Sequence, residues 1–215
     1  MPEILTFSLV TFSAVFFVVN PFAVIPLFLS ITRGDSLEKK RSTALRSSVA
    51  VAVTLFLFGA AGSQVLSLLG VTLSAFRIAG GILLFRIALD MVNAQKSRSR
   101  TSPEEEREGI EKDDVAIVPL AIPMLTGPGS MATAMVLSSE AWGSAAHMIA
   151  VAASFLATAV ATYFLLGAAT HLERMLGRTG LNIMSRVMGL VLAAMAVQFA
   201  VNGILDLFPS LASKG

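Results

Sequence analysis

Two long apolar stretches of the chain are interrupted by proline, glycine and small polar residues. Proline lacks a backbone N–H and clashes with the preceding helical turn, so each stretch is expected to be a helix broken in its middle. Within a membrane, freed backbone groups are tolerated only where protein or a water-filled cavity satisfies them. A pair of such breaks in matching halves of a chain therefore points to a solute-binding site. The candidate binding residues are Asn20, Pro21, Phe22 and Pro26 at the first break, and Pro123, Thr126, Gly127, Pro128, Gly129 and Ser130 at the second.

The chemistry of these breaks favours a small zwitterion. Asn is a good helix cap and Pro suits the first helical position, so a new half-helix is expected to begin at each break. A helix N-terminus carries about half a positive charge and offers N–H groups to a carboxylate. The half-helices that end there leave carbonyls for an ammonium group. The side chains of Asn20, Thr126 and Ser130 are expected to add hydrogen bonds.

The breaks lie in a chain whose composition is typical of membrane proteins. Hydrophobic residues make up 55% of the 215 residues, charged residues only 14%, and the mean hydropathy is +0.77. Runs of about 20 apolar residues predict membrane-spanning helices. We expect six spans, and no separate soluble domain. The predicted spans are roughly 4–31, 43–69, 73–94, 115–138, 145–170 and 183–208.

The distribution of basic residues predicts the orientation. Lys and Arg are concentrated in the loops after the first, third and fifth predicted spans, although the net charge is only +2. The positive-inside rule places these loops in the cytosol. We therefore expect a multi-pass protein of the cell (inner) membrane with both termini outside the cytosol. Because the basic residues flank the spans and do not form a single patch, we expect no nucleic-acid partner.

The two halves of the chain resemble each other weakly. Matched motifs occur in the same order at a separation of 107 or 109 residues. The matches are Asn20-Pro21 with Gly127-Pro128, Gly70 with Gly177, Arg77-Ile78-Ala79-Gly80 with Arg186-Val187-Met188-Gly189, and Asn93 with Asn202. Three spans in each half force the second half to enter the membrane from the opposite side. The predicted fold is an all-α polytopic membrane protein with two inverted three-helix repeats, residues 1–94 and 115–215, whose first spans are both broken mid-membrane.

A charged cytosolic linker, residues 95–114, joins the predicted repeats. It begins with a Ser-Arg-Ser-Arg sequence and then contains a helix-start pattern, so a short helix is predicted near Pro103–Gly109. A second such pattern, Asp35 with Glu38, is expected to cap the start of the second span.

A few polar residues inside or at the ends of spans are candidates for ion coupling or gating. Arg77 and Arg186 lie near span ends, where a role in gating and a purely interfacial position are both open. Arg86 and Asp90 are four residues apart, which predicts a structural ion pair or, alternatively, a site of ion coupling. Asn93 and Asn202 are expected to form hydrogen bonds between helices or to take part in gating.

These motifs make the chain resemble the MarC family of integral membrane proteins, which belongs with the LysE-like exporters. The matching segments are Asn20–Phe28, Arg77–Leu84, Pro119–Pro123, Gly127–Gly129, Arg186–Leu190 and Asn202–Ile204. The resemblance covers nearly the whole chain and implies a six-span bacterial or archaeal membrane protein. It also implies similarity to transporters of small neutral amino acids such as glycine and alanine. Phe22 stands where relatives often have a smaller residue, which leaves the substrate size open.

The predicted function is secondary transport of small neutral amino acids by alternating access. A small-solute channel and a non-transporting membrane scaffold or regulator are the alternatives. We expect no enzymatic activity, because the sequence lacks cysteine and shows no zinc-protease, nucleophile or phosphate-loop motif. No cofactor or metal is expected, although coupling to H⁺ or Na⁺ is possible. The expected partners are a small zwitterionic solute and the lipid bilayer.

Overall fold

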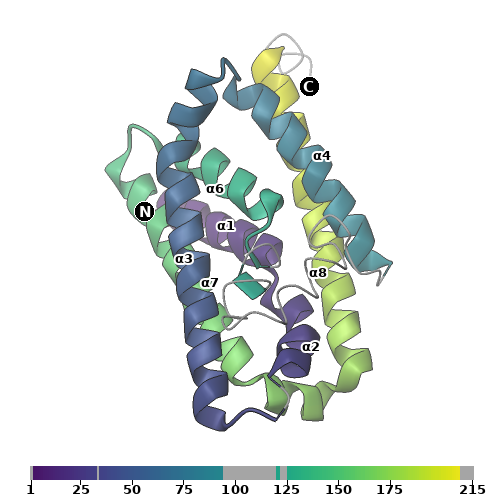
Figure 1. Ribbon diagram of the computed structural model, residues 1–215. Coiled ribbons are helices and arrows are strands. Elements are labelled where there is room, and N and C mark those ends of the chain that lie inside the picture. Colours follow the sequence, from purple (N-terminus) through teal and green to yellow (C-terminus); the bar gives the residue numbers. More distant parts are fainter. Residues whose placement is uncertain (1, 33, 94–119, 122–124, 209–215) are drawn as a thin grey trace.

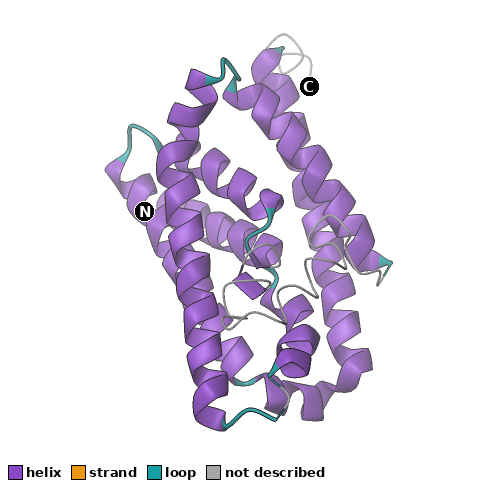
Figure 2. Cartoon of the chain, in the orientation of Figure 1, coloured by secondary structure: helices purple, strands orange, loops and turns teal. Residues whose placement is uncertain are grey.

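A computed structural model describes residues 2–32, 34–93, 120–121 and 125–208. In this part of the chain the secondary structure is helical, with no strand (Figures 1 and 2). The predicted linker, its short helix near Pro103–Gly109, and the predicted binding residue Pro123 lie outside the described residues. The helices are α1 (Pro2–Val19), α2 (Pro21–Ile31), α3 (Leu37–Leu68), α4 (Leu73–Val92), α6 (Pro128–Ala141), α7 (Ala145–Gly167) and α8 (Ala169–Leu207).

Among the described residues, four segments are long and apolar enough to cross a membrane. They are Glu3–Ile31, Leu37–Gly62, Ala145–Gly167 and Thr179–Leu207. They correspond to the predicted first, second, fifth and sixth spans. α4 corresponds to the predicted third span, while the predicted fourth span lies partly outside the described residues.

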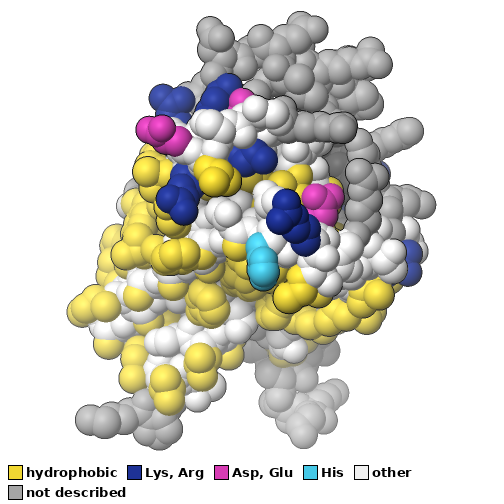
Figure 3. Space-filling model, turned by 90° about the horizontal axis from the view of Figure 1, so that it is seen from below, with side chains coloured by type: hydrophobic (Ala, Val, Ile, Leu, Met, Phe, Trp, Pro, Cys, Tyr) yellow, Lys and Arg dark blue, Asp and Glu magenta, His cyan; other side chains and the backbone are white. Residues whose placement is uncertain are grey.

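Apolar side chains cover much of the outside of the bundle. Leu57 on α3 and Ile149 on α7 are 60% and 68% exposed, values that hydrocarbon contact explains better than water contact. Basic side chains instead gather at the end where α3 and α8 begin, which Figure 3 views directly. We call this the basic end, and the end where α3 gives way to α4 and α8 finishes the far end (Figure 1).

α4 and α8 run side by side and antiparallel (Figure 1). Three glycines allow the close approach, because a Cβ on any of them would come within contact distance of a backbone oxygen of the other helix. The distance from such a Cβ to the facing oxygen is 2.6 Å for Gly81 and Ala196 O, 3.0 Å for Gly189 and Ala88 O, and 2.7 Å for Gly203 and Ser74 O. This packing places Asp206 on α8 beside Arg77 near the start of α4.

Two matched glycines both have a positive φ. Gly70, in the turn between α3 and α4, has φ +68°, and Gly177, at a kink within α8, has φ +63°. The left-handed region is accessible to glycine at little cost. The kink divides α8, so that its apolar span begins only at Thr179.

The start of α3 differs from the expectation. The cap is Ser36, whose Oγ accepts from the Lys39 N–H (3.3 Å), whereas Asp35 forms an ion pair with the Lys39 side chain (3.0 Å). The predicted capping role of Asp35 is therefore wrong. Ser36 has extended backbone angles, and a residue in that conformation aims its side chain at the free N–H groups of the first turn.

Replacing Ser36 with alanine should lower the free energy of unfolding by about 1 kcal/mol, the usual cost of a lost N-cap. Asp35→Asn is the control, and it should change stability by less than about 1 kcal/mol because its ion pair is solvent-exposed. Thermal unfolding in detergent micelles measures both. A larger effect for Asp35→Asn than for Ser36→Ala would contradict the assignment of the cap.

Candidate functional site

The first predicted break is confirmed as a break between two helices. α1 ends at Val19, and Asn20 adopts the left-handed conformation (φ 47°, ψ 69°) before α2 begins at Pro21. The Asn20 N–H donates to Phe16 O (2.9 Å), closing α1, while the Asn20 Oδ1 accepts from the Ala23 N–H (3.4 Å), capping α2. Asn is among the few residues with a side chain that enter this backbone region readily.

Two other predicted residues of the first break take different positions. Phe22 is partly buried and meets Phe16 edge-on, with ring centroids 6.3 Å apart. Pro26 lies inside the continuous helix α2, and its side chain is exposed. The structure therefore places Phe22 beside the break and Pro26 away from it.

The second break lies just before α6. Gly127 has an extended backbone, and Pro128 is the first residue of α6, as the sequence predicts. Thr126 is fully buried, and both its N–H and its hydroxyl donate to Ala121 O (2.8 Å each). Gly127 supplies no side-chain cap to α6, so this helix start differs from the capped start of α2.

Ser130 spans the second break by a hydrogen bond. Its buried hydroxyl donates to Leu125 O (3.0 Å), on the other side of Gly127 and Pro128. In this conformation the hydroxyls of Ser130 and Thr126 thus donate to main-chain carbonyls beside the break, which gives both buried hydroxyls a partner away from water. We expected them to serve a solute, but here they stabilise the break itself.

Both breaks meet the inner face of α4. The Asn20 Nδ2 points to the Met91 sulfur (3.5 Å). At the other break, a Cβ added to Gly129 would lie 2.8 Å from Leu84 Cδ2 and 3.2 Å from Ile87 Cδ1. Residues distant in sequence are therefore brought together on one side of a single helix.

The breaks also lie next to each other. The same position on Gly129 would be 3.7 Å from Val18 Cγ1, and Val18 precedes Asn20 by only two residues. Val18 and the inner face of α4 belong to one buried apolar cluster. The structure thus unites the two predicted breaks in the interior of the bundle.

Within the part of the chain that the structure describes, Asn20 is a poorly satisfied donor at this meeting point. Its exposed fraction is 0%, yet its amide N–H₂ faces a thioether, which is a weak hydrogen-bond acceptor. A buried amide of this kind usually finds an oxygen partner. The site can therefore offer a donor to a stronger acceptor such as a carboxylate, if Met91 moves aside.

Three residues of the site, Leu84, Ile87 and Met91, are not marked as site residues by any feature of the sequence. Methionine and aliphatic residues fill membrane helices everywhere, so their types alone carry no signal. A helical spacing of three to four residues places all three on one face of α4, but the facing partner is visible only in the fold.

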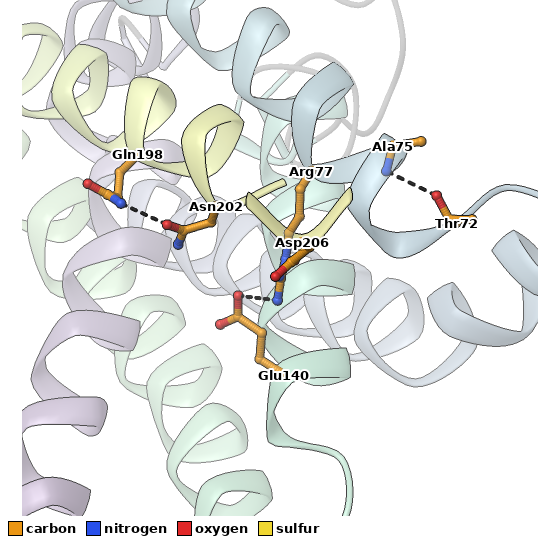
Figure 4. Close-up of polar contacts among 7 residues, drawn as sticks. All are labelled: Thr72, Ala75, Arg77, Glu140, Gln198, Asn202 and Asp206. Atoms are coloured by element: carbon orange, nitrogen blue, oxygen red, sulfur yellow. Dashed lines mark hydrogen bonds and ion pairs between the residues drawn. The ribbon is translucent and has the colours of Figure 1, made fainter. Parts of the chain in front are cut away.

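A second polar cluster lies at the far end. Arg77 projects from α4 between Glu140 on α6 and Asp206 on α8, and its guanidinium pairs with both carboxylates (Figure 4). The Nη2–Oε1 distance to Glu140 is 2.6 Å. The Arg77 side chain is only 13% exposed, so it is held between helices rather than extended to an interface. The sequence predicts Arg77 as a gating candidate, but it does not indicate that Glu140 and Asp206 are its partners.

The remaining coupling or gating candidates do not join this cluster. Arg86 and Arg186 are exposed, Asp90 is half-buried, and Asn93 ends α4 as its C-cap. Asn202 accepts a hydrogen bond from Gln198 Nε2 (2.7 Å), one turn earlier on α8 (Figure 4). The matched arginines Arg77 and Arg186 thus have different surroundings.

Comparison with known proteins identifies the family. A profile described as MarC family integral membrane protein matches residues 5–208. The chain belongs to the MarC family. The resemblance inferred from the Asn-Pro and Gly-Pro-Gly motifs is thereby confirmed. No solved structure matches this MarC protein.

Similar relatives come from archaea and bacteria. The UPF0056 membrane protein MJ1677 of Methanocaldococcus jannaschii is 38% identical over 93% of this chain and 97% of its own. The UPF0056 membrane protein YhcE of Escherichia coli K12 is 33% identical over 93% of each chain. YvbG of Bacillus subtilis is 32% identical over 97% of this chain and 99% of its own. Their names state a membrane location and no substrate, so they describe a membrane protein without an assigned function.

Proposed function

We propose that this MarC protein is a secondary transporter of small neutral amino acids such as glycine and alanine, without enzymatic activity. The observation that carries the proposal is the meeting of two helix breaks in the interior, where, among the described residues, the buried amide of Asn20 donates to the Met91 sulfur. Broken helices are tolerated at membrane depth where they line a protein interior or a cavity. They are a recurrent way to build solute sites in transporters.

The proposed solute binds by its two charges. Its carboxylate takes the Asn20 amide N–H and the uncapped start of α6 at Gly127 and Pro128, where the helix dipole favours an anion. Its ammonium group donates hydrogen bonds to main-chain carbonyl oxygens at the same breaks. Gly129 packs closely against the side chains of Leu84 and Ile87, and this crowding favours a solute with a small side chain, such as glycine or alanine.

The proposed architecture is six spans in two inverted repeats, residues 1–94 and 115–215. Gly70 and Gly177, which match in sequence, both have φ near +65° and both precede the third span of their half. The third spans, α4 and the later part of α8, pack antiparallel through glycines, as a two-fold axis in the membrane plane would require. These two observations support the repeat.

The proposed location is the inner cell membrane, with both termini outside the cytosol. The gathering of Lys and Arg at the basic end supports this orientation, because positively charged loops remain in the cytosol. The far end, with the Arg77 cluster, then faces outward. Coupling to H⁺ or Na⁺ supplies the driving force in this proposal.

Purified protein should be stabilised by alanine in a thermal-shift assay, since a ligand that binds only the folded state raises its stability. At about 100 times the Kd, the gain is about 2.7 kcal/mol. A basic amino acid such as lysine serves as the control and should give no shift, because the site has no acidic side chain at either break.

Proteoliposomes then separate the rival functions. A transporter predicts alanine uptake that saturates and shows counterflow, whereas a channel predicts flux without counterflow. A scaffold or regulator predicts neither flux nor a thermal shift with any amino acid. Absence of both responses for glycine and alanine would contradict the proposed function.

A further inference from the structure

The far end of the bundle contains a charged cluster with an uneven charge. One guanidinium, that of Arg77, bridges two carboxylates, those of Glu140 and Asp206 (Figure 4). The cluster therefore carries one excess negative charge when both acids are ionised. Arg77 is 13% exposed and Glu140 30% exposed, so water compensates this charge only in part. Addition of one proton makes the cluster neutral.

The cluster joins helices from the two proposed repeats. Arg77 belongs to the first repeat, while Glu140 and Asp206 belong to the second. Beneath it, α4 meets α6 where a Cβ on Gly80 would lie 3.5 Å from the Ala132 Cβ. Separation of α4 from α6 at this end requires the Arg77–Glu140 pair to break.

The protonation of Glu140 is sensitive to this closed arrangement. Glu140 lies beyond the proposed fourth span. Burial raises the pKa of its carboxyl above the ordinary value and the nearby Asp206 raises it further, while the charge and hydrogen bond of Arg77 act in the opposite direction. The ionisable residues on the elements around this end of α6 are Arg77 on α4, Asp206 on α8, Glu3 on α1 and His147 on α7, with none on α3 after Arg46.

We propose that Arg77, Glu140 and Asp206 form a proton-binding site that closes the far end of the transport pathway, and that release of the proton to the outside medium opens it. This proposal rests on the proposed alternating access and names the proton as the ion that controls one gate. The proton comes from outside water, resides on a carboxylate oxygen of Glu140, and returns to the same water. This structure represents the closed gate.

The direction of the pH effect follows from linkage. In the open gate Glu140 meets water, so its carboxyl binds the proton more weakly than in the closed gate. A ligand that binds one state more tightly shifts the equilibrium toward that state, so a proton favours closure. The gate is therefore expected to be closed at low external pH and to open as pH rises through the pKa of Glu140.

A single cysteine can report the gate without any solute, because the natural chain contains none. Ala132 is 6% exposed and lies two turns before Glu140 on α6. The thiol of Ala132→Cys should therefore react with a membrane-impermeant maleimide only when the far end opens. Leu69→Cys is the reference, since Leu69 is 68% exposed at the same end. Its labelling rate corrects for the pH dependence of the thiol itself.

In proteoliposomes we expect the corrected labelling of Ala132→Cys to rise at least about threefold between about pH 5 and about pH 8. Glu140→Gln, which imitates the protonated acid, should make labelling slow and independent of pH. Arg77→Gln removes the bridge and should make labelling fast at both pH values. All variants are first checked for a monodisperse elution profile.

Several results would overturn the gate. If the labelling rate of Ala132→Cys still depended on pH in the Glu140→Gln variant, Glu140 would not be the proton-binding residue. Labelling that is absent at every pH, or that falls as pH rises, contradicts opening by proton release. Because no solute is present, these outcomes are separate from a failure of alanine transport, which would contradict the proposed substrate and leave the gate result standing.

Discussion

Asn20→Ala should reduce the initial rate of alanine uptake into proteoliposomes at least about tenfold, the equivalent of losing about 1.4 kcal/mol of hydrogen bonding to a buried group. The change removes the amide N–H₂ that faces Met91 and, in the proposed function, the solute carboxylate. It also removes the cap of α2, since the Asn20 Oδ1 accepts from the Ala23 N–H. Uptake of radiolabelled alanine at saturating and limiting concentrations measures the effect.

Asn20→Gly separates the side chain from the backbone. Glycine accepts the φ of 47° without strain, whereas alanine does not. We therefore expect Asn20→Gly to fold better than Asn20→Ala but to transport equally poorly. Asn182→Ala, at an exposed position on α8, is the control and should transport normally. Normal alanine uptake by a folded Asn20→Gly protein would contradict the assignment of Asn20 to the binding site.

Gly81→Ala should destabilise the protein by about 1–3 kcal/mol, the usual cost of overpacking. The new Cβ would lie 2.6 Å from Ala196 O and 2.9 Å from Ala200 N, and neither backbone atom can move unless the two helices separate. The gain in helix propensity from glycine to alanine, about 1 kcal/mol, only partly offsets this clash. Thermal unfolding in detergent micelles measures the change.

The adjacent residue provides a matched control. Gly80 lies next to Gly81 on α4, and among the described residues a Cβ on Gly80 contacts the Ala132 Cβ alone, at an ordinary distance of 3.5 Å. Gly80→Ala should therefore leave stability unchanged or raise it by up to about 1 kcal/mol. If the two variants behaved alike, the close approach of α4 to α8 at Gly81 would be wrong.

Local chemistry made several features predictable. Asn20-Pro21 marks the start of α2, and Gly127-Pro128 marks the start of α6, because proline lacks a backbone N–H and fits the first helical position, where that N–H would have no helical partner. Long apolar runs likewise predict membrane helices from composition alone, and within the described residues four of the predicted spans satisfy the criterion of length and hydropathy. The motifs also identified the MarC family, which the comparison confirms.

Local signals misjudged the end of a helix in one place. Asp35 and Ser36 are both good caps, and the sequence pattern with Glu38 favoured Asp35. The choice depends on which residue has extended backbone angles when the chain turns into α3, and that residue is Ser36. Backbone angles at a turn depend on the path of the flanking segments and are not specified by residue type.

The partners across helices became visible only in the tertiary structure. Arg77 lies 63 residues from Glu140 and 129 from Asp206, and Asn20 lies 71 from Met91. An isolated arginine near a span end is compatible with an interface, a lipid headgroup or an ion pair, and only packing selects among them. Sequence order specifies where each helix breaks or carries a charge, because these effects are local. Helix packing specifies which breaks and charges meet, because that depends on glycine contacts such as those between α4 and α8.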